Sequence, residues 1–242
     1  MAGRPPGVLV VFAKAPRPGL VKTRMSPALS QEEAAELYGH MLDDVLGASR
    51  AISEQLGLEA VVAGHPDDGL EELARHLDGS LRVIRQRGRN LAERMRWASA
   101  EAAAGGARRI LLRGSDSPTL GPRIVEDALD ALDDCDLALS PDQGGGYGLV
   151  ALRRPAAALF DHPMSTSRVL DDTRANAERL GLRIRLVGSC IDVDRVEDLD
   201  LLAAGRSQPD AYLCQRTLDC IDSRDLWRRV TGPTSRAGVP PA

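Results

Sequence analysis

The sequence contains few aromatic residues and almost no lysine. Aromatic side chains make up 3% of the 242 residues, so a core must be built from Leu, Val, Ile and Ala, which the 43% of hydrophobic residues can supply. Lys14 and Lys22 are the only lysines among 31 Lys and Arg residues. In a chain that otherwise uses arginine, two lysines in one loop indicate positions where the two side chains are not interchangeable.

Several classes of protein are excluded by what is missing. The net charge of −4 argues against a nucleic-acid binder, which would carry a basic excess. No hydrophobic run reaches the length of a membrane span, and the N-terminal MAGRPPG lacks the apolar core of a signal peptide. We therefore expect a cytoplasmic protein without a membrane partner. The four cysteines show no C-x-x-C spacing and the four histidines no metal-ligand spacing, which argues against a zinc site or a disulfide framework.

Three common motifs are also absent. No G-x-G-x-x-G follows the first apolar run, which disfavours a dinucleotide Rossmann site. The stretch GLVKT lacks the GK[ST] of a Walker loop, and no G-x-S-x-G elbow is present. Any phosphate site must therefore be built differently.

Apolar strands and amphipathic helices alternate over about 200 residues. We expect strands at 8–12, 58–63, 81–84, 109–113, 136–140, 147–152 and 182–187, and helices at 31–56, 70–77, from 91, at 122–132, 167–180 and 195–205. This order predicts an α/β fold with a mostly parallel sheet flanked by helices. Residues 1–205 would form a single domain, and residues 206–242 a C-terminal extension with one further helix and then a disordered tail.

A cationic loop follows the first expected strand. It carries Lys14, Arg17, Lys22 and Arg24, and it is stiffened by Pro16, Pro18 and Gly19. Ligands of parallel sheets bind outside the carboxyl ends of the strands, so this loop predicts an anion-binding site, of the kind a phosphate requires.

Acidic residues are expected at the same edge of the sheet. Asp116 follows the strand at 109–113, where it either holds a divalent cation or caps the turn. Asp192 and Asp194 alternate along an extended segment and so point to one side. They either share a cation, or pair with Arg195, or cap the next helix, for which Asp194 is well placed. Three acids at strand ends favour a shared Mg²⁺ or Mn²⁺ site.

Three further loops give weaker signals. The glycine run at 144–146 either lets backbone approach a ligand or makes a plain hairpin turn. The stretch with Gln86, Gly88 and Arg89 either contacts a base or phosphate or lies on the surface. The residues at 165–167 either bind an acceptor or cap the next helix. With the cations and acids, these loops suit metal-assisted transfer from a nucleoside di- or triphosphate.

Five stretches, FAKAPRPGLVKTRMSPALS, LLRGSDSPTL, GGYGLVAL, STSRVLDDT and DVDRVEDL, resemble the DUF2064 family of glycosyltransferase-A-like proteins. The resemblance covers roughly residues 8–205 and implies a nucleotide-diphospho-sugar transferase fold. Some members of the family are described as arsenosugar-biosynthesis glycosyltransferases. The related 2-phospholactate guanylyltransferases share the KTR loop, a Pro-Asp-x-x-Gly segment like that at Pro141-Asp142, and DVDxxEDL.

The chain departs from the family pattern at three positions. Gly144 stands where an acid is usual, Gly148 where an aromatic is common, and Met164 where the family usually has Trp. Asp142 could replace the missing acid. Gly148 and Met164 would line the acceptor pocket, so the identity of the acceptor is the least transferable property.

Residues and resemblance together give one site hypothesis. Lys22 and Asp116 would be catalytic, and Asp116, Asp192 and Asp194 would hold Mg²⁺ or Mn²⁺. The nucleotide would contact Ala13, Lys14, Gly19, Lys22, Arg24, Gln86, Gly88 and Ser115. The acceptor would contact Asp142, Gly145, Gly146, Tyr147, Ser165 and Thr166.

We expect a metal-dependent nucleotide-binding transferase, first of all a glycosyltransferase that acts on a small-molecule acceptor. The first alternative is a nucleotidyltransferase that moves a nucleoside monophosphate onto a phosphorylated small molecule and releases pyrophosphate. The second alternative, supported by the missing acid at Gly144, is a non-catalytic nucleotide-binding protein. A homodimer is compatible with the sequence.

Overall fold

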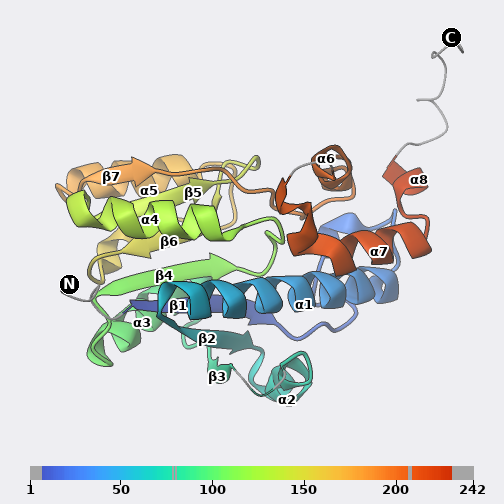
Figure 1. The fold of residues 1–242 in the computed structure, drawn as a ribbon, viewed down its shortest axis with the longest axis horizontal. Helices are drawn as coiled ribbons and strands as arrows, with labels where there is room; N and C mark the ends of the chain where they lie inside the picture. The colour runs from blue at the N-terminus through green and yellow to red at the C-terminus, as the bar shows by residue number, and fades with distance from the viewer. Residues whose placement is uncertain (1–6, 78, 80, 207–208, 231–242) are drawn as a thin grey trace, which may run out of the picture.

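The chain is built around one seven-stranded sheet with the order β3-β2-β1-β4-β6-β5-β7 (Figure 1). A computed structural model describes residues 7–77, 79, 81–206 and 209–230. The strands are β1 Gly7–Lys14, β2 Leu58–His65, β3 Arg82–Arg85, β4 Arg109–Gly114, β5 Leu137–Pro141, β6 Tyr147–Leu152 and β7 Ile184–Leu186.

The predicted mostly parallel sheet is confirmed, with one reversal. β1 pairs in parallel with β2 and β4, β2 with β3, and β5 with β7. β6 lies between β4 and β5 and is antiparallel to both, because the short connection after Pro141 returns the chain directly beside β5. The carboxyl ends of β1, β2, β3, β4 and β5 therefore share one edge of the sheet.

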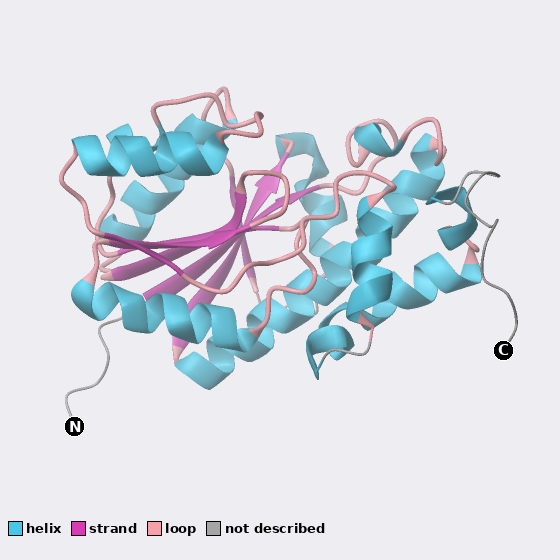
Figure 2. Cartoon of the chain, turned by 90° about the horizontal axis from the view of Figure 1, so that it is seen from above, coloured by secondary structure: helices cyan, strands magenta, loops and turns pink. Residues whose placement is uncertain are grey.

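Helices cover both faces of the sheet (Figure 2). The longest, α1 Gln31–Leu56, begins with a capping box: the Glu33 amide donates to Ser30 Oγ at 3.2 Å, and the Ser30 amide donates to Glu33 Oε2 at 2.8 Å. The other helices are α2 Leu70–Ala74, α3 Leu91–Ala104, α4 Pro122–Asp134, α5 Val169–Arg179, α6 Asp198–Gly205, α7 Gln215–Ser223 and α8 Trp227–Val230, with 3-10 turns η1 Thr23–Met25, η2 Asp67–Gly69, η3 Ala157–Phe160 and η4 Pro209–Cys214.

The core lies on both faces of the sheet, because alternate strand residues point to opposite sides. Val10 and Leu112 pack with Met95 of α3, whereas Leu9 and Leu111 pack with residues of α1 and α4.

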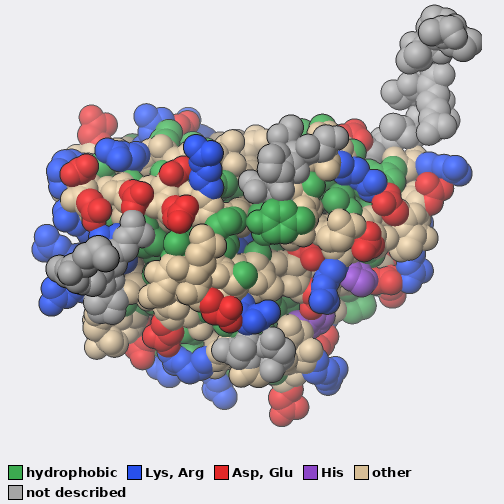
Figure 3. Space-filling model, in the orientation of Figure 1, with side chains coloured by type: hydrophobic (Ala, Val, Ile, Leu, Met, Phe, Trp, Pro, Cys, Tyr) green, Lys and Arg blue, Asp and Glu red, His purple; other side chains and the backbone are tan. Residues whose placement is uncertain are grey.

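Acidic and basic side chains are interspersed over the face shown in Figure 3. Within the described residues, no helix is long and apolar enough to cross a membrane.

Residues beyond Gly205 form more structure than the one helix expected. η4 and α7 pack against α1, and α8 packs against α6, at one end of the molecule (Figure 1). A shared apolar cluster joins them to the loop after β1 and to the segment after β7; it includes Met25, Leu37, Val193, Val196, Leu199, Leu218, Ile221 and Leu226. The tail predicted for the last residues falls at 231–242, outside the described part of the chain.

Three predicted elements differ from the structure. Helix α2 ends at Ala74 rather than at residue 77. The segment before α6 is not a strand: the amides of Cys190 and Val193 donate to Pro141 O and Asp116 O, in the loops after β5 and β4. Helix α6 begins at Asp198 rather than at residue 195, because the Asp198 carboxylate accepts from the amides at 194 and 195 and holds them in a turn.

Candidate functional site

The cationic loop after β1 and the acidic segment before α6 meet at the carboxyl end of the sheet. The Lys22 side chain is 2% exposed, and its Nζ donates to Asp116 Oδ1 and, at 2.6 Å, to Val193 O. The same Nζ lies 4.0 Å from Asp194 Oδ1. Lys22, Asp116 and Asp194, which the sequence placed at one edge, are thus brought together around a buried ammonium.

The backbone of Lys22 is strained. It adopts the left-handed conformation, with φ 49° and ψ 33°, immediately before η1. A residue with a Cβ pays about 1–2 kcal/mol for this conformation. Among the described residues outside glycine, Asp225 alone shares the positive φ. The strained turn directs the Lys22 side chain inward, where it meets the acids.

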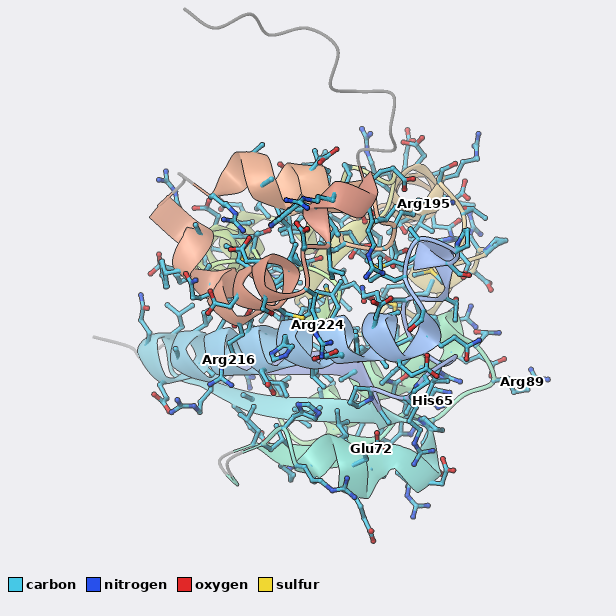
Figure 4. All side chains as sticks on the ribbon, turned by 90° about the vertical axis from the view of Figure 1, so that its right-hand side faces the viewer. His65, Glu72, Arg89, Arg195, Arg216 and Arg224 are labelled. Carbon is cyan, nitrogen blue, oxygen red and sulfur yellow. The ribbon has the colours of Figure 1, made fainter. Side chains whose placement is uncertain are left out.

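Arg24 adds a second link between the two segments. Its NH1 lies 2.6 Å from Asp194 Oδ2, and about half of the side chain is exposed. The carboxylate of Asp194 is therefore paired with a cation and does not cap α6, which was the alternative expected from sequence. Arg195, the other expected partner, lies on the molecular surface (Figure 4).

Asp192 lies deeper than the other two acids. Ser117 Oγ donates to Asp192 Oδ1 at 3.2 Å, and the Asp192 amide donates to Gln143 Oε1 at 3.0 Å. Burial, and then repulsion from Asp116 and Asp194, raise the pKa of the Asp192 carboxyl to about 7. The sequence did not indicate Gln143, because a glutamine beside a glycine run carries no distinctive pattern.

Hydrogen bonds of Tyr38, a residue of α1, connect the loop 114–117 to that helix. Ser115 Oγ and Tyr38 Oη lie 2.8 Å apart, and the Lys14 amide donates to Tyr38 Oη at 2.9 Å. Burial raises the pKa of Tyr38 well above its usual range, so the phenol stays neutral. Tyr38 thereby links the loops after β1 and β4, a role that its place on the apolar face of a helix did not reveal.

A second group of cations lies at the ends of β1, β2 and β3. The pKa of His65 is lowered first by burial and then by the nearby charges of Arg94 and Lys14. Within the described residues, neither Lys14 nor Arg94 has a carboxylate partner. The sequence predicted Lys14 here but not His65, which the pairing of β1 with β2 places opposite Lys14, and not Arg94, which lies on α3 Leu91–Ala104.

The predicted nucleotide-binding loop after β3 lies against this group. Gln86 Nε2 donates to Ala63 O at 2.7 Å and to Ala13 O at 3.2 Å, and Arg94 Nε donates to Gly88 O at 3.1 Å. Ala13, Lys14, Gln86 and Gly88 are therefore close together.

Two arginines that the sequence suggested as phosphate ligands, Arg17 and Arg89, pair with carboxylates instead. Arg17 donates to Glu72 Oε2 at 2.7 Å and to Asp68 Oδ2 at 3.1 Å, which fastens its loop to α2. Arg89 pairs with Glu93 and projects into solvent (Figure 4). In each case a carboxylate on a neighbouring element or turn holds the guanidinium. Gly19 has φ 76° and serves a turn in the same loop.

The glycine run packs against the loop before α5. Asp142 Oδ1 accepts from the amides of Gly144 and Gly146 at 2.7 and 2.9 Å, so this carboxylate is engaged within its own turn. Gly145 has φ 83°, and a Cβ there would lie 2.1 Å from Ser167 O. The residues assigned to the acceptor at 142–147 and 165–166 thus form neighbouring loops, whose acceptor role stays a prediction.

Gly148 does not line an acceptor pocket, contrary to expectation. It is buried, and a Cβ would lie 2.4 Å from Cys190 Sγ and 2.7 Å from Ser117 Oγ. The hydroxyl of Tyr147 faces Thr173 Oγ1 at 3.4 Å, and Met164 packs against the core. An aromatic side chain at 148 would require a different arrangement of Cys190 and Ser117.

The acids offer oxygen ligands that a divalent cation could use. Oδ2 of Asp116 and Oδ2 of Asp192 accept no hydrogen bond from the part of the chain that the structure describes. Among those residues, no three His, Cys, Asp or Glu side chains are already arranged to enclose a metal, and the Lys22 ammonium contacts Asp116 instead. Hard oxygen ligands with free lone pairs fit Mg²⁺ or Mn²⁺.

Comparisons with known proteins identify the relatives of this chain. A family model described as "Uncharacterized protein conserved in bacteria (DUF2064)" matches residues 48–166. A phosphoenolpyruvate guanylyltransferase of Sphaerobacter thermophilus is 30% identical over 184 residues, which cover 75% of this chain and 86% of that protein. A 2-phospho-L-lactate guanylyltransferase of Methanothermobacter thermautotrophicus is 30% identical over 182 residues, which cover 74% of this chain and 76% of that protein.

A solved structure extends the similarity to the whole fold. A putative nucleotide-diphospho-sugar transferase of Desulfovibrio desulfuricans G20 superposes with a TM-score of 0.76 at 28% identity, over 90% of this chain and 97% of that one. The predicted transferase-like fold is confirmed.

Proposed function

The chain belongs to the DUF2064 family, and on that basis we propose that it transfers a nucleoside monophosphate from a nucleoside triphosphate to a phosphorylated small molecule. It is a nucleotide-dependent transferase. The observation that carries the proposal is the 30% identity to guanylyltransferases over three quarters of the chain. This similarity favours nucleotidyl transfer over the glycosyl transfer that the sequence first suggested. The names of these relatives point to GTP as donor and to a small phosphorylated carboxylic acid as acceptor.

The proposed reaction is a substitution at the α-phosphorus. A phosphate oxygen of the acceptor forms a bond to that phosphorus, and the bond to the oxygen bridging the α- and β-phosphates breaks. Pyrophosphate leaves with the electron pair of that bond. Negative charge increases on the leaving oxygen and around the α-phosphate, so cations fixed in place before the reaction lower the barrier.

Lys22 is the side chain best placed for that task. Its ammonium is buried and already oriented by Asp116 and Val193 O, so little reorganisation is needed when charge develops. Lys14 and Arg94 have no carboxylate partner within the described residues and are available for the remaining phosphates. Arg24, half exposed, would hold the outer edge of the same anion.

A divalent cation, Mg²⁺ or Mn²⁺, would be held by Asp116 and Asp192 with Asp194 nearby. It would neutralise charge on the nucleotide phosphates and orient them. The three carboxylates exceed the two positive charges of Lys22 and Arg24, which supports a further cation at this site. The roles assigned to Gly145, Gly146, Ser165 and Thr166 in holding the acceptor rest on their place beside this group.

Glycosyl transfer is the second candidate, because the similar Desulfovibrio protein is described as a putative nucleotide-diphospho-sugar transferase. The two reactions differ in what leaves. Nucleotidyl transfer releases pyrophosphate from a triphosphate, whereas glycosyl transfer releases a nucleoside diphosphate from a nucleotide sugar.

The test measures both products from the purified protein. Four nucleoside triphosphates are each combined with phosphoenolpyruvate, 2-phospholactate and other small phosphorylated acids, with Mg²⁺, and pyrophosphate is measured; a panel of nucleotide sugars is assayed for diphosphate release. We expect pyrophosphate with GTP and loss of turnover in EDTA and in Asp116→Asn. Asp133→Asn, which removes a carboxylate from an ion pair at the start of β4, should remain active. Diphosphate release without pyrophosphate release would overturn the proposal.

A further inference from the structure

In the part of the chain that the structure describes, one buried arginine lies without a carboxylate partner directly beneath the proposed site. Arg113 is the penultimate residue of β4, and its side chain is 1% exposed. NH1 donates to Ser49 Oγ at 3.1 Å and NH2 donates to Ser117 O at 3.0 Å. Its Nε has no hydrogen-bond partner within the described residues. Burial lowers the pKa of Arg113 to about 10, so the guanidinium remains charged at neutral pH.

An unpaired buried charge costs stability, and the same strand shows a paired one. Arg109 lies four residues earlier and points to the same face of β4. Its NH2 pairs with Asp133 and its NH1 donates to Leu129 O at 3.0 Å. Within the described residues no such partner accompanies Arg113, so charge balance does not account for it.

The contacts of Arg113 lead to the acids of the site. Ser117, whose carbonyl oxygen accepts from Arg113, donates through Oγ to Asp192 at 3.2 Å. The carbonyl oxygen of Asp116, in the same short loop, accepts from the Val193 amide at 2.9 Å. Fixing Ser117 therefore fixes the loop that carries Asp116 and one side of Asp192.

We propose that Arg113 is a positioning residue of the transferase site, which ties the 114–117 loop to α1 from inside the protein. The anchor on α1 is rigid, because Ser49 Oγ donates to Val45 O at 2.6 Å and is fixed by the helix. The planar guanidinium carries separate donors that reach Ser49 and Ser117 at once, whereas a lysine has one nitrogen. The expected effect of Arg113 on catalysis rests on the proposed function. Its role in ordering the loop 114–117 does not depend on that function.

The test compares Arg113→Met with Arg109→Met, which removes the paired arginine of the same strand. Pyrophosphate release gives kcat and KM, urea unfolding gives stability, and hydrogen exchange followed by mass spectrometry gives the order of residues 114–119. In Arg113→Met we expect kcat to fall by about 100-fold, because small misplacements of reacting groups have effects of that size. The KM for the nucleotide should be unchanged, exchange at 114–119 faster, and unfolding no easier than in the wild type.

Arg109→Met should show the opposite pattern, with lower stability, wild-type kcat and unchanged exchange at 114–119. Arg113→Lys keeps the charge but cannot span both acceptors, so its kcat should stay well below the wild-type value. Wild-type kcat in Arg113→Met or Arg113→Lys, or unchanged exchange in Arg113→Met, would overturn the proposal. If the wild type releases no pyrophosphate, the proposed function fails, and the exchange measurement alone still decides whether Arg113 orders the loop.

Discussion

The Lys22 ammonium donates a hydrogen bond of 2.6 Å to the carbonyl oxygen of Val193, 171 residues further along the chain. This contact joins the loop that would hold the nucleotide phosphates to the segment that carries Asp192 and Asp194. A backbone carbonyl accepts from the ammonium without a change in net charge. The site thus keeps the positive charge of Lys22 beside Asp116 while it fixes the position of Nζ.

Lys22→Arg is expected to lower kcat by about 100-fold or more, comparable to removal of one fixed donor from a charge-stabilising site. The Lys22 side chain is buried and its ammonium contacts Asp116 and Val193 O, so a larger planar guanidinium would have to displace these neighbours. Arg82→Lys, which exchanges the same two side chains in an exposed ion pair at the start of β3, is the control. Pyrophosphate release measures both variants, and equal activity in the two would contradict the role assigned to Lys22.

One glycine-to-alanine change should destabilise the protein and another should stabilise it. In Gly148→Ala the new Cβ would meet Cys190 Sγ and Ser117 Oγ, so we expect a loss of roughly 1–3 kcal/mol from overpacking. Gly47 is exposed in the middle of α1 with open space around it, and Gly47→Ala should add up to about 1 kcal/mol. Urea unfolding measures both; a stable Gly148→Ala would show that the site tolerates a side chain there.

Asp44 of α1 caps a helix that belongs to another part of the chain. Its carboxylate accepts from the amides of Arg216 and Thr217 and from Thr217 Oγ1, at the start of α7. Asp44→Ala would leave these buried donors unpaired and should cost about 1–3 kcal/mol in the free energy of unfolding. Asp43→Ala, which removes a surface carboxylate paired with His76 and Arg216, should cost at most about 1 kcal/mol. Equal losses would remove the case for Asp44 as the cap.

The ion pair between Glu33 and Arg229 predicts a loss of stability in acid. Arg229, followed by the Ser30 amide, lowers the pKa of Glu33 from 4.5 to about 2. A lowered pKa in the folded state stabilises the protein above pH 4.5, and this contribution disappears as the pH falls to about 2.

Because the pair lies at the surface, Glu33→Gln should cost about 1 kcal/mol at pH 6 and nothing near pH 2. Urea unfolding across this range measures the difference, which added salt should reduce. Glu54→Gln, in a more exposed pair on the same helix, is the control. A difference that does not change with pH would contradict this assignment.

The strands could be predicted because each is a short apolar run bounded by turn residues, as at 109–113 and 147–152. The direction of β6 could not be predicted, because an apolar run is equally compatible with parallel and antiparallel pairing. Likewise, the acids before α6 were predicted from their alternation, whereas the pairing of that segment with the loops after β4 and β5 depends on contacts that are distant in sequence.

The same distinction holds for the site. Lys22, Asp116 and Asp194 were found because charged residues at strand ends are visible in the sequence. His65 was missed because only the register of β1 and β2 places it opposite Lys14. Arg94 was missed because it lies on α3, which the fold brings to the same place. Arg17 and Arg89 looked equally suitable for binding a phosphate. In the structure Arg17 pairs with Glu72 and Arg89 pairs with Glu93, and the sequence alone does not predict these ion pairs.

The apolar cluster that joins the C-terminal helices to the site has a consequence for synthesis on the ribosome. Met25, close to Lys22 in the chain, leaves the ribosome early, whereas Leu218 and Leu226, which complete its cluster, are translated near the end of the described residues. At about 5–20 residues per second, the nascent chain must wait roughly 10–40 s between them. During that interval the apolar surface behind the phosphate loop is uncovered, so a newly made chain needs protection from aggregation until its final helices emerge.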